Sequence, residues 1–111
     1  MSYIHKELAQ GRWLQLSFFE QMANVGSEVV RAINWREKNV QYSWAAFERA
    51  LELLDLTIDD EKNKARRWEL TRVREVLADY LVGDNIYKST DLNWRNYFYA
   101  FNYAARLEVG V

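Results

Sequence analysis

Several residue types are missing or scarce in this chain of 111 residues, which has no cysteine, no proline, four glycines and one histidine. Without cysteine, neither a disulfide scaffold nor a thiolate metal site can form. The lone histidine, His5, cannot supply a Ser-His-acid set, and it lies outside the Glu-x-x-His spacing of metal-binding bundles. No glycine-rich loop is present, which excludes P-loop and Rossmann sites. We therefore expect no metal, no cofactor and no catalytic residues.

Charge of one sign and long apolar runs are lacking too. The chain has 15 basic and 16 acidic residues, a net charge of -1, and so no global attraction to nucleic acid or anionic lipid. No run of 18 apolar residues occurs, so we expect no membrane span. The first residues lack the basic-then-apolar pattern of a signal peptide, and we expect a cytoplasmic protein.

What is present is a strong helical pattern. Half of the residues are hydrophobic and 15% are aromatic, enough for the core of a single domain over residues 1–111. Apolar residues recur with a period of 3.6 almost everywhere, which predicts helices over 3–37, 40–58, 62–82 and 90–108. Short connections favour antiparallel neighbours, so the predicted fold is an all-α, four-helix up-and-down antiparallel bundle.

Residues at the predicted helix ends fit this division. Gly83 is expected to end the third helix as a left-handed cap, and Gly110 lies where the fourth should end. Asp59 or Asp60 can cap the start of the third helix, and Ser89 or Thr90 the start of the fourth.

The first predicted helix carries an unusual polar seam opposite its apolar face. The seam residues follow one another at steps of 4, 3, 4, 3, 4 and 4, and they are Trp13, Ser17, Glu20, Asn24, Ser27, Arg31 and Trp35. The apolar face is predicted to hold Leu16, Phe19, Met22, Ala23, Gly26, Val30 and Ile33, with Ile4 and Leu8 before them. Two tryptophans on a polar seam indicate that it meets something other than water.

Three interpretations of the seam remain open. It can be a solvated face, an interface with a second copy in which Asn24 fixes the register, or a polar ligand pocket with Glu20, Asn24 and Arg31 as contacts. The helix length bears on this choice, because 35 residues would extend about 50 Å while the other helices reach only about 27–32 Å. Either the first helix breaks near Gly11 or its surplus packs on another chain.

A basic run offers a different function. Residues 62–74 hold six cations and one tryptophan, a composition typical of nucleic-acid contacts. The candidate contacts are Arg66, Arg67, Trp68 and Arg74. On a helical wheel the cations scatter, with only Arg67 and Arg74 sharing a face, so a solvated helix start is the simpler interpretation.

Two stretches, residues 16–31 (LSFFEQMANVGSEVVR) and 49–58 (RALELLDLTI), resemble a group of small uncharacterised prokaryotic helical-bundle proteins of about this length. The resemblance implies a compact all-helical bundle and no assigned activity. We expect a non-enzymatic interaction module that forms a homodimer through the first helix and the aromatic fourth helix, where Tyr97, Tyr99 and Tyr103 exceed what one core can bury. The alternative is an RNA- or nucleotide-associated bundle, and a third possibility is an enzyme acting on a small polar ligand.

Overall fold

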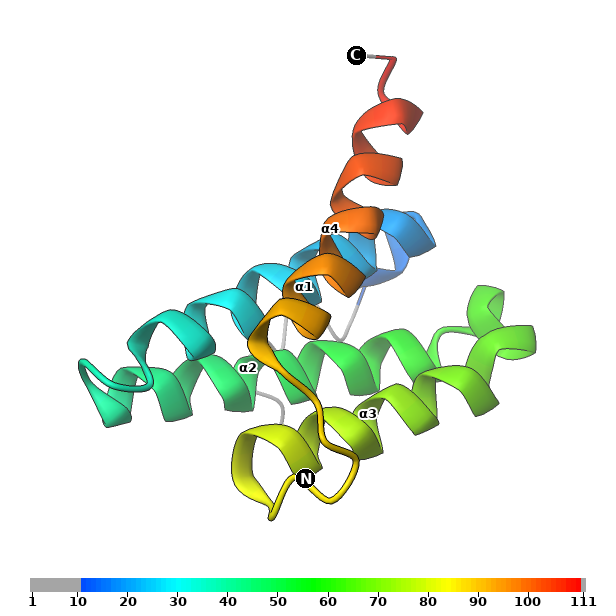
Figure 1. Ribbon diagram of the computed structural model, residues 1–111. Coiled ribbons are helices and arrows are strands. Elements are labelled where there is room, and N and C mark those ends of the chain that lie inside the picture. The colour runs from blue at the N-terminus through cyan, green and yellow to red at the C-terminus, as the bar shows by residue number, and fades with distance from the viewer. Residues whose placement is uncertain (1–10, 111) are drawn as a thin grey trace.

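The computed structural model describes residues 11–110, so His5 and the predicted first turns from residue 3 lie outside the described residues. The elements are a short 3-10 helix η2 (Trp13–Gln15), α1 (Phe18–Trp35), α2 (Val40–Asp59), a 3-10 helix η3 (Glu61–Arg66), α3 (Arg67–Val82) and α4 (Asp91–Glu108). No strand occurs within residues 11–110. The all-α, four-helix prediction is confirmed (Figure 1).

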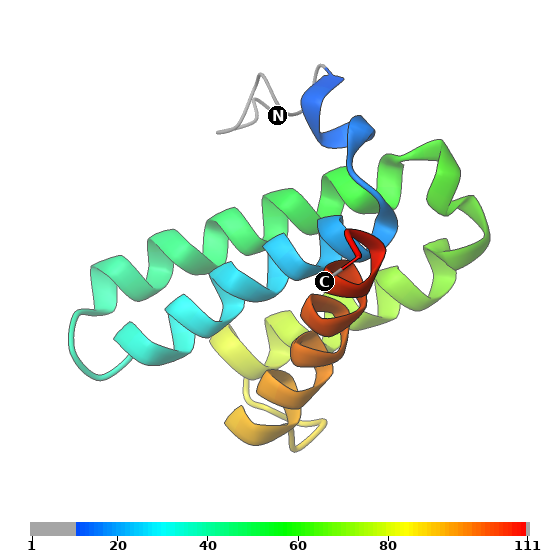
Figure 2. The same ribbon diagram turned by 90° about the horizontal axis from the view of Figure 1, so that it is seen from above.

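The first three helices run up and down beside one another, and α4 completes the bundle in a different way. It crosses over α1 instead of lying alongside it, and its last turns project beyond the other helices (Figures 1 and 2). The hydroxyl of Ser17, at the start of α1, donates a hydrogen bond of 2.6 Å to Glu108 at the end of α4.

The first helix is much shorter than the periodicity predicts, because the chain turns at Leu16 and Ser17. Leu16 has an extended ψ of 145°, and Ser17 caps α1. The Ser17 hydroxyl accepts from the Glu20 backbone N–H at 3.1 Å, while the Glu20 carboxylate accepts from the Ser17 N–H at 3.0 Å. This reciprocal capping box starts α1 at Phe18. The prediction of one helix over 3–37 is therefore wrong, and of the two alternatives a break occurs, at Leu16 and Ser17 and so a few residues beyond the predicted region near Gly11.

A helix of 18 residues is about 27 Å long, close to its neighbours, so α1 has no surplus length to pack on another chain. The argument for an interface that rested on that surplus no longer applies.

The other predicted helix ends agree with the structure, with one exception. Asp60 caps η3 and Thr90 caps α4. Gly110, with φ of +75°, follows α4 in the left-handed region. Gly83 ends α3 as predicted but with φ of -95°, so the left-handed cap is wrong. It has a steric reason instead, since a Cβ there would lie 3.0 Å from the backbone of Asp79.

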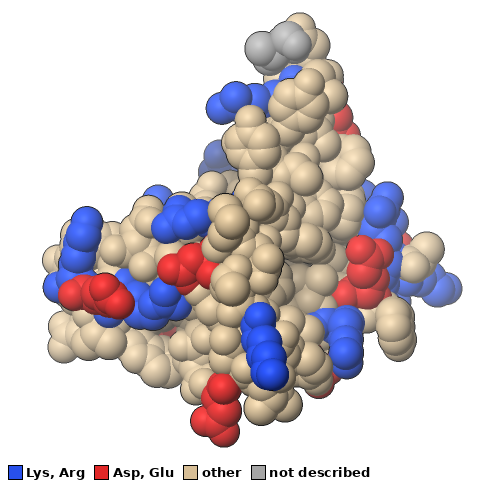
Figure 3. Space-filling view, in the orientation of Figure 1, with Lys and Arg blue, Asp and Glu red and all other residues tan. Residues whose placement is uncertain are grey.

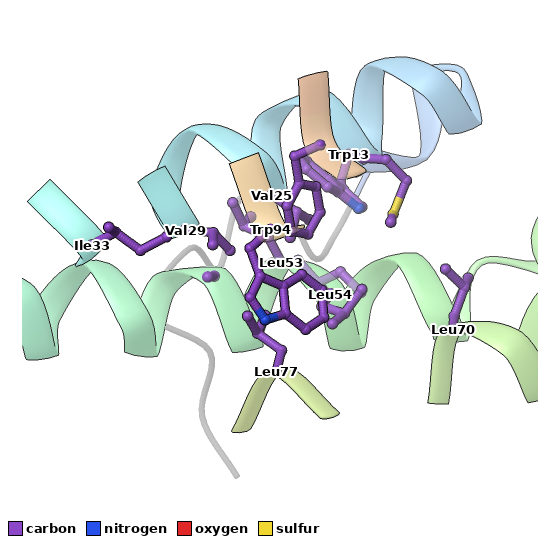
Figure 4. Packing of buried hydrophobic residues seen from close by; sticks show 13 residues of the cluster. Trp13, Val25, Val29, Ile33, Leu53, Leu54, Leu70, Leu77 and Trp94 are labelled. Carbon is purple, nitrogen blue, oxygen red and sulfur yellow. The ribbon is translucent and has the colours of Figure 1, made fainter. Parts of the chain in front are cut away.

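The core lies between α1, α2 and α3 and is closed by α4 (Figure 4). Its fully buried side chains include Val25 and Val29 of α1, Leu54 of α2 and Leu77 of α3. The predicted apolar face of α1 is rotated from the observed one, because it contained Ala23 and Val30, which are only partly buried, and omitted both core valines. The choice between adjacent wheel positions depends on the neighbours, which periodicity alone does not specify.

Helix α4 meets α1 at Gly26. A Cβ built at Gly26 would lie only 2.6 Å from Phe98 Cβ and 2.9 Å from Phe98 Cγ. The missing side chain thus lets the two helices approach closely, and the Phe98 ring is buried against α1.

Candidate functional site: the cleft between the first and last helices

Trp13 does not belong to the polar seam. It lies on η2 before the turn into α1, where it is buried and its Nε1 donates to the Thr57 hydroxyl at 3.2 Å. The prediction that all seven seam residues share one helix face is wrong for Trp13, because α1 begins only at Phe18.

The next three seam residues have local partners within α1. Ser17 and Glu20 form the capping box, and the Asn24 side-chain amide donates to the Glu20 carbonyl at 2.8 Å. Neither Glu20 nor Asn24 lines the cleft that holds Arg31, so the structure does not assemble the predicted ligand contacts Glu20, Asn24 and Arg31 as one pocket. The role of Asn24 in fixing a register stays a prediction.

The remaining seam residues, Ser27, Arg31 and Trp35, do share one surface. They form one wall of a cleft of about 620 Å³ in the angle between α1 and α4. The full lining is Ala23, Gly26, Ser27, Val30, Arg31, Asn34, Trp35, Arg95, Phe98, Tyr99 and Asn102. A cleft of this volume falls within the usual range of binding sites, about 300–1,000 Å³.

The walls of the cleft carry positive charge and no carboxylate. Arg95 reaches across from α4 and donates to the Asn34 side-chain oxygen at 2.7 Å. Arg31 pairs at 2.7 Å with Glu28, which also accepts from Arg49 at 2.9 Å. Glu28 thus pairs with two arginines, and the three side chains together keep a net positive charge.

At one end of the cleft, the Trp35 ring stands edge-on to Tyr42, with 5.0 Å between ring centroids. The Trp35 ring, Tyr99, Phe98 and Val30 together give the cleft an amphipathic lining. Such a lining suits apolar side chains that carry a polar tip.

Beside the cleft, α4 presents an outward stripe of large apolar residues at helical spacing, named here the α4 stripe. It consists of Leu92, Tyr99, Tyr103 and Leu107, which are 65%, 64%, 55% and 55% exposed. Most of the surface over α4 is uncharged in the view of Figure 3. The sequence interpretation found the two tyrosines but missed the leucines that extend their row.

Tyr97 differs from the other two tyrosines predicted to lie at an interface. It is partly buried, with its ring 5.0 Å from that of Phe98 and 5.2 Å from that of Phe101. Burial, assisted by the charge of Glu69, raises the pKa of Tyr97 to about 12. Tyr97 therefore belongs to the inner side of α4.

The basic run does not form a free cationic patch. Arg67 donates to the Ile58 carbonyl at 2.9 Å, close to the end of α2, and Arg74 pairs with Asp55 at 2.6 Å. The Arg66 guanidinium lies 4.2 Å from the centroid of the Phe18 ring. Trp68 remains 83% exposed. Three of the four candidate nucleic-acid contacts thus have partners within the fold. The cations point in different directions, as the helical wheel predicts.

A buried polar network, missed from the sequence, anchors η2 and η3 to α1. The Gln21 amide donates to the Trp13 carbonyl at 3.0 Å and to the Asp60 carboxylate at 2.8 Å, and Asn63 donates to Gln21 at 2.8 Å. Burial opposes ionisation of Asp60, but hydrogen bonds from Lys62 and Gln21 outweigh it and lower its pKa. Its hydrogen bonds within the fold indicate a structural role.

Within residues 11–110, no group of acids or histidines is placed to hold a metal ion, and no helix is long and apolar enough to span a membrane. No family model matches the chain, and neither a curated protein nor a solved structure matches it significantly. The resemblance to small prokaryotic helical-bundle proteins therefore stays a prediction.

Proposed function

We propose that this chain is a non-enzymatic, cytoplasmic interaction module that forms a homodimer through the α4 stripe and the adjoining α1–α4 cleft. The observation that carries the proposal is the stripe itself. Tyr99 and Tyr103 alone expose roughly 240 Å², taking about 200 Å² for a whole side chain. With the two leucines the stripe approaches the few hundred Å² at which an apolar patch on a monomer is often functional.

A second copy fits this surface because a ridge and a cleft lie side by side on it. Tyr99 belongs to both, since it is part of the stripe and also lines the cleft. A two-fold axis places the same surface on both partners, so the two stripes can pack on each other while the clefts border the contact. The near-zero net charge of -1 adds little repulsion between copies.

In the proposed dimer the two α4 helices pair antiparallel about a two-fold axis that passes between Tyr99 and Tyr103. Tyr99 and Tyr103 are four residues apart, so in an antiparallel pair each Tyr99 faces Tyr103 of the other copy in two adjacent layers. The hydroxyls then reach the wet rim, while the rings and the flanking leucines cover one another.

The first test is the oligomeric state, measured by sedimentation velocity at protein concentrations from about 1 to 100 µM. We expect a dimer for the native chain and a monomer for the double variant Tyr99→Lys/Tyr103→Lys. Trp68→Lys is the matched control, because it replaces an even more exposed ring on α3 and should leave the dimer intact. A native monomer throughout this range would refute the proposal.

The absence of cysteine allows a second test of the geometry. A mixture of the Tyr99→Cys and Tyr103→Cys variants should form a disulfide between copies on mild oxidation, because the two positions face each other in the proposed pair. Each variant alone should crosslink much less. Equal crosslinking in all three samples would contradict antiparallel pairing.

RNA binding through Arg66, Arg67, Trp68 and Arg74 has weaker support, because Arg67 and Arg74 are held by α2. Binding of that kind must weaken steeply as salt is raised.

A further inference from the structure

A second cavity lies on another side of α4, between that helix and α3. It has a volume of about 260 Å³ and is lined by Val73 and Val76 of α3, by Trp94 and Tyr97 of α4, and by Arg72 and Asn93. The apolar residues form its body, while Arg72 and Asn93 add polar groups. Its size, just under the usual range for drug-sized ligands, suits a small molecule. We name it the α3–α4 groove.

The groove is bordered by a buried hydrogen-bond donor that lacks an acceptor. Trp94 is buried, and among residues 11–110 its indole N–H finds no partner. In Figure 4 the indole nitrogen points toward α3, above Leu77. A buried tryptophan N–H is normally hydrogen-bonded, and one without an acceptor has lost the hydrogen bond that water would supply. An acceptor supplied by a ligand would replace that hydrogen bond.

A cation whose ion pair is long stands at the same groove. The side chain of Arg72 is 53% exposed, and its nearest carboxylate, Glu75, is 3.8 Å away. Glu75 already accepts a 2.7 Å hydrogen bond from the Tyr87 hydroxyl, and the Arg72 guanidinium lies 5.1 Å from the centroid of the Tyr87 ring. Arg72 can therefore bind an incoming carboxylate without breaking a short ion pair.

From these features we infer that the α3–α4 groove binds a small amphipathic carboxylate, such as a medium-chain fatty acid. The apolar chain lies against Val73 and Val76, and the carboxylate oxygens accept from Arg72 and from the Trp94 indole N–H. The indole edge turns toward the groove on binding. Since Tyr97 borders the groove whereas Tyr99 and Tyr103 form the stripe, this site does not depend on the proposed dimer.

The experiment uses octanoate as the probe and the indole N–H signals of ¹⁵N-labelled protein as the readout. The five tryptophans give five such signals, and the Trp94→Phe variant identifies that of Trp94. Octanoate should shift the Trp94 signal saturably below about 10 mM, with the other four signals changing less. The absence of a saturable shift would overturn the inference.

Two variants and one analogue separate the parts of the proposal. Arg72→Gln, at an exposed position, should weaken octanoate binding about tenfold. Val76→Phe fills the groove and should abolish the shift, with retention of the helical circular dichroism signal showing that it folds. Octanol, which lacks the charge, should bind at least about tenfold more weakly. Equal binding of octanol would overturn the carboxylate assignment, and binding unchanged in both variants would overturn the site.

Discussion

The crossing of α1 and α4 at Gly26 allows a sharp test by the substitution Gly26→Ala. The added methyl would lie 2.6 Å from Phe98 Cβ and 2.9 Å from Phe98 Cγ, where relaxed carbon contacts are about 3.5–4.0 Å. Because Cβ is attached directly to the α4 backbone, no change of the Phe98 rotamer can relieve the closest contact. The helices must separate by about 1 Å.

Two opposing effects decide whether Gly26→Ala raises or lowers the free energy of unfolding. Alanine is favoured over glycine inside a helix by about 1 kcal/mol. Overpacking a tight contact costs about 1–3 kcal/mol or more, and this contact lies toward the upper end because the backbone itself must move. We therefore expect Gly26→Ala to lower the free energy of unfolding by about 1–2 kcal/mol. For a domain of this size the loss corresponds to a fall in Tm of about 5–15 °C.

Urea denaturation and calorimetry measure this change, and Gly11→Ala is the matched control. A Cβ at Gly11 has nothing within 4 Å, so Gly11→Ala should not destabilise the fold. Phe98→Ala should not rescue Gly26→Ala, because alanine keeps the Cβ that makes the closest contact. A Gly26→Ala variant as stable as the native chain would refute the close crossing of α1 and α4.

Two further predictions concern the buried polar network. Trp13→Phe keeps most of the buried ring but loses the donor to Thr57, so urea denaturation should show a loss of about 1 kcal/mol, whereas Trp68→Phe should change stability by less than about 0.5 kcal/mol. The pKa of Asp60 is lowered from 3.8 in the folded state, so its stabilising contribution is present above that pH and is lost as pH falls through the folded pKa. Asp60→Asn should therefore be less stable at pH 7 and lose less stability on acidification below pH 4; an unchanged acid denaturation profile would contradict this role.

Helical periodicity predicted the fold class because it depends on local spacing alone. It placed α2, α3 and α4 within a few residues of their observed bounds, apart from the 3-10 turn that precedes α3. The caps Asp60 and Thr90 were predictable for the same reason, since an N-cap acts on the backbone two or three residues ahead.

The start of α1 at Phe18 could also have been predicted from the sequence, but Ser17 and Glu20 were assigned to the polar seam instead. Ser17 and Glu20 have the spacing of a capping box ahead of an apolar run, a recognised signal for a helix start. Reading the same two residues as a polar face extended the helix backward and joined Trp13 to a seam that it does not share. A serine three residues before a glutamate can mark the start of a helix, or it can form part of a polar face within one, and the spacing is the same in both cases.

The buried polar network gave no such signal. Gln21 is separated from Asp60 by 39 residues and from Asn63 by 42, so its burial follows from how η2 and η3 close over one end of α1. The same holds for Gly26, whose importance depends on Phe98 of α4. Contacts of this kind depend on which helices meet and at what crossing.

Both candidate sites follow from that crossing. A helix that crosses its neighbour touches it closely at one point, here Gly26 against Phe98, and the two axes diverge on either side. Divergence from α1 leaves the cleft that holds Arg31 and Arg95, while the far side of α4 leaves the groove beside α3. A helix packed along α1 would close that cleft. Moving α4 outward by Gly26→Ala should therefore alter dimer formation and octanoate binding together, although no residue that lines the groove is changed.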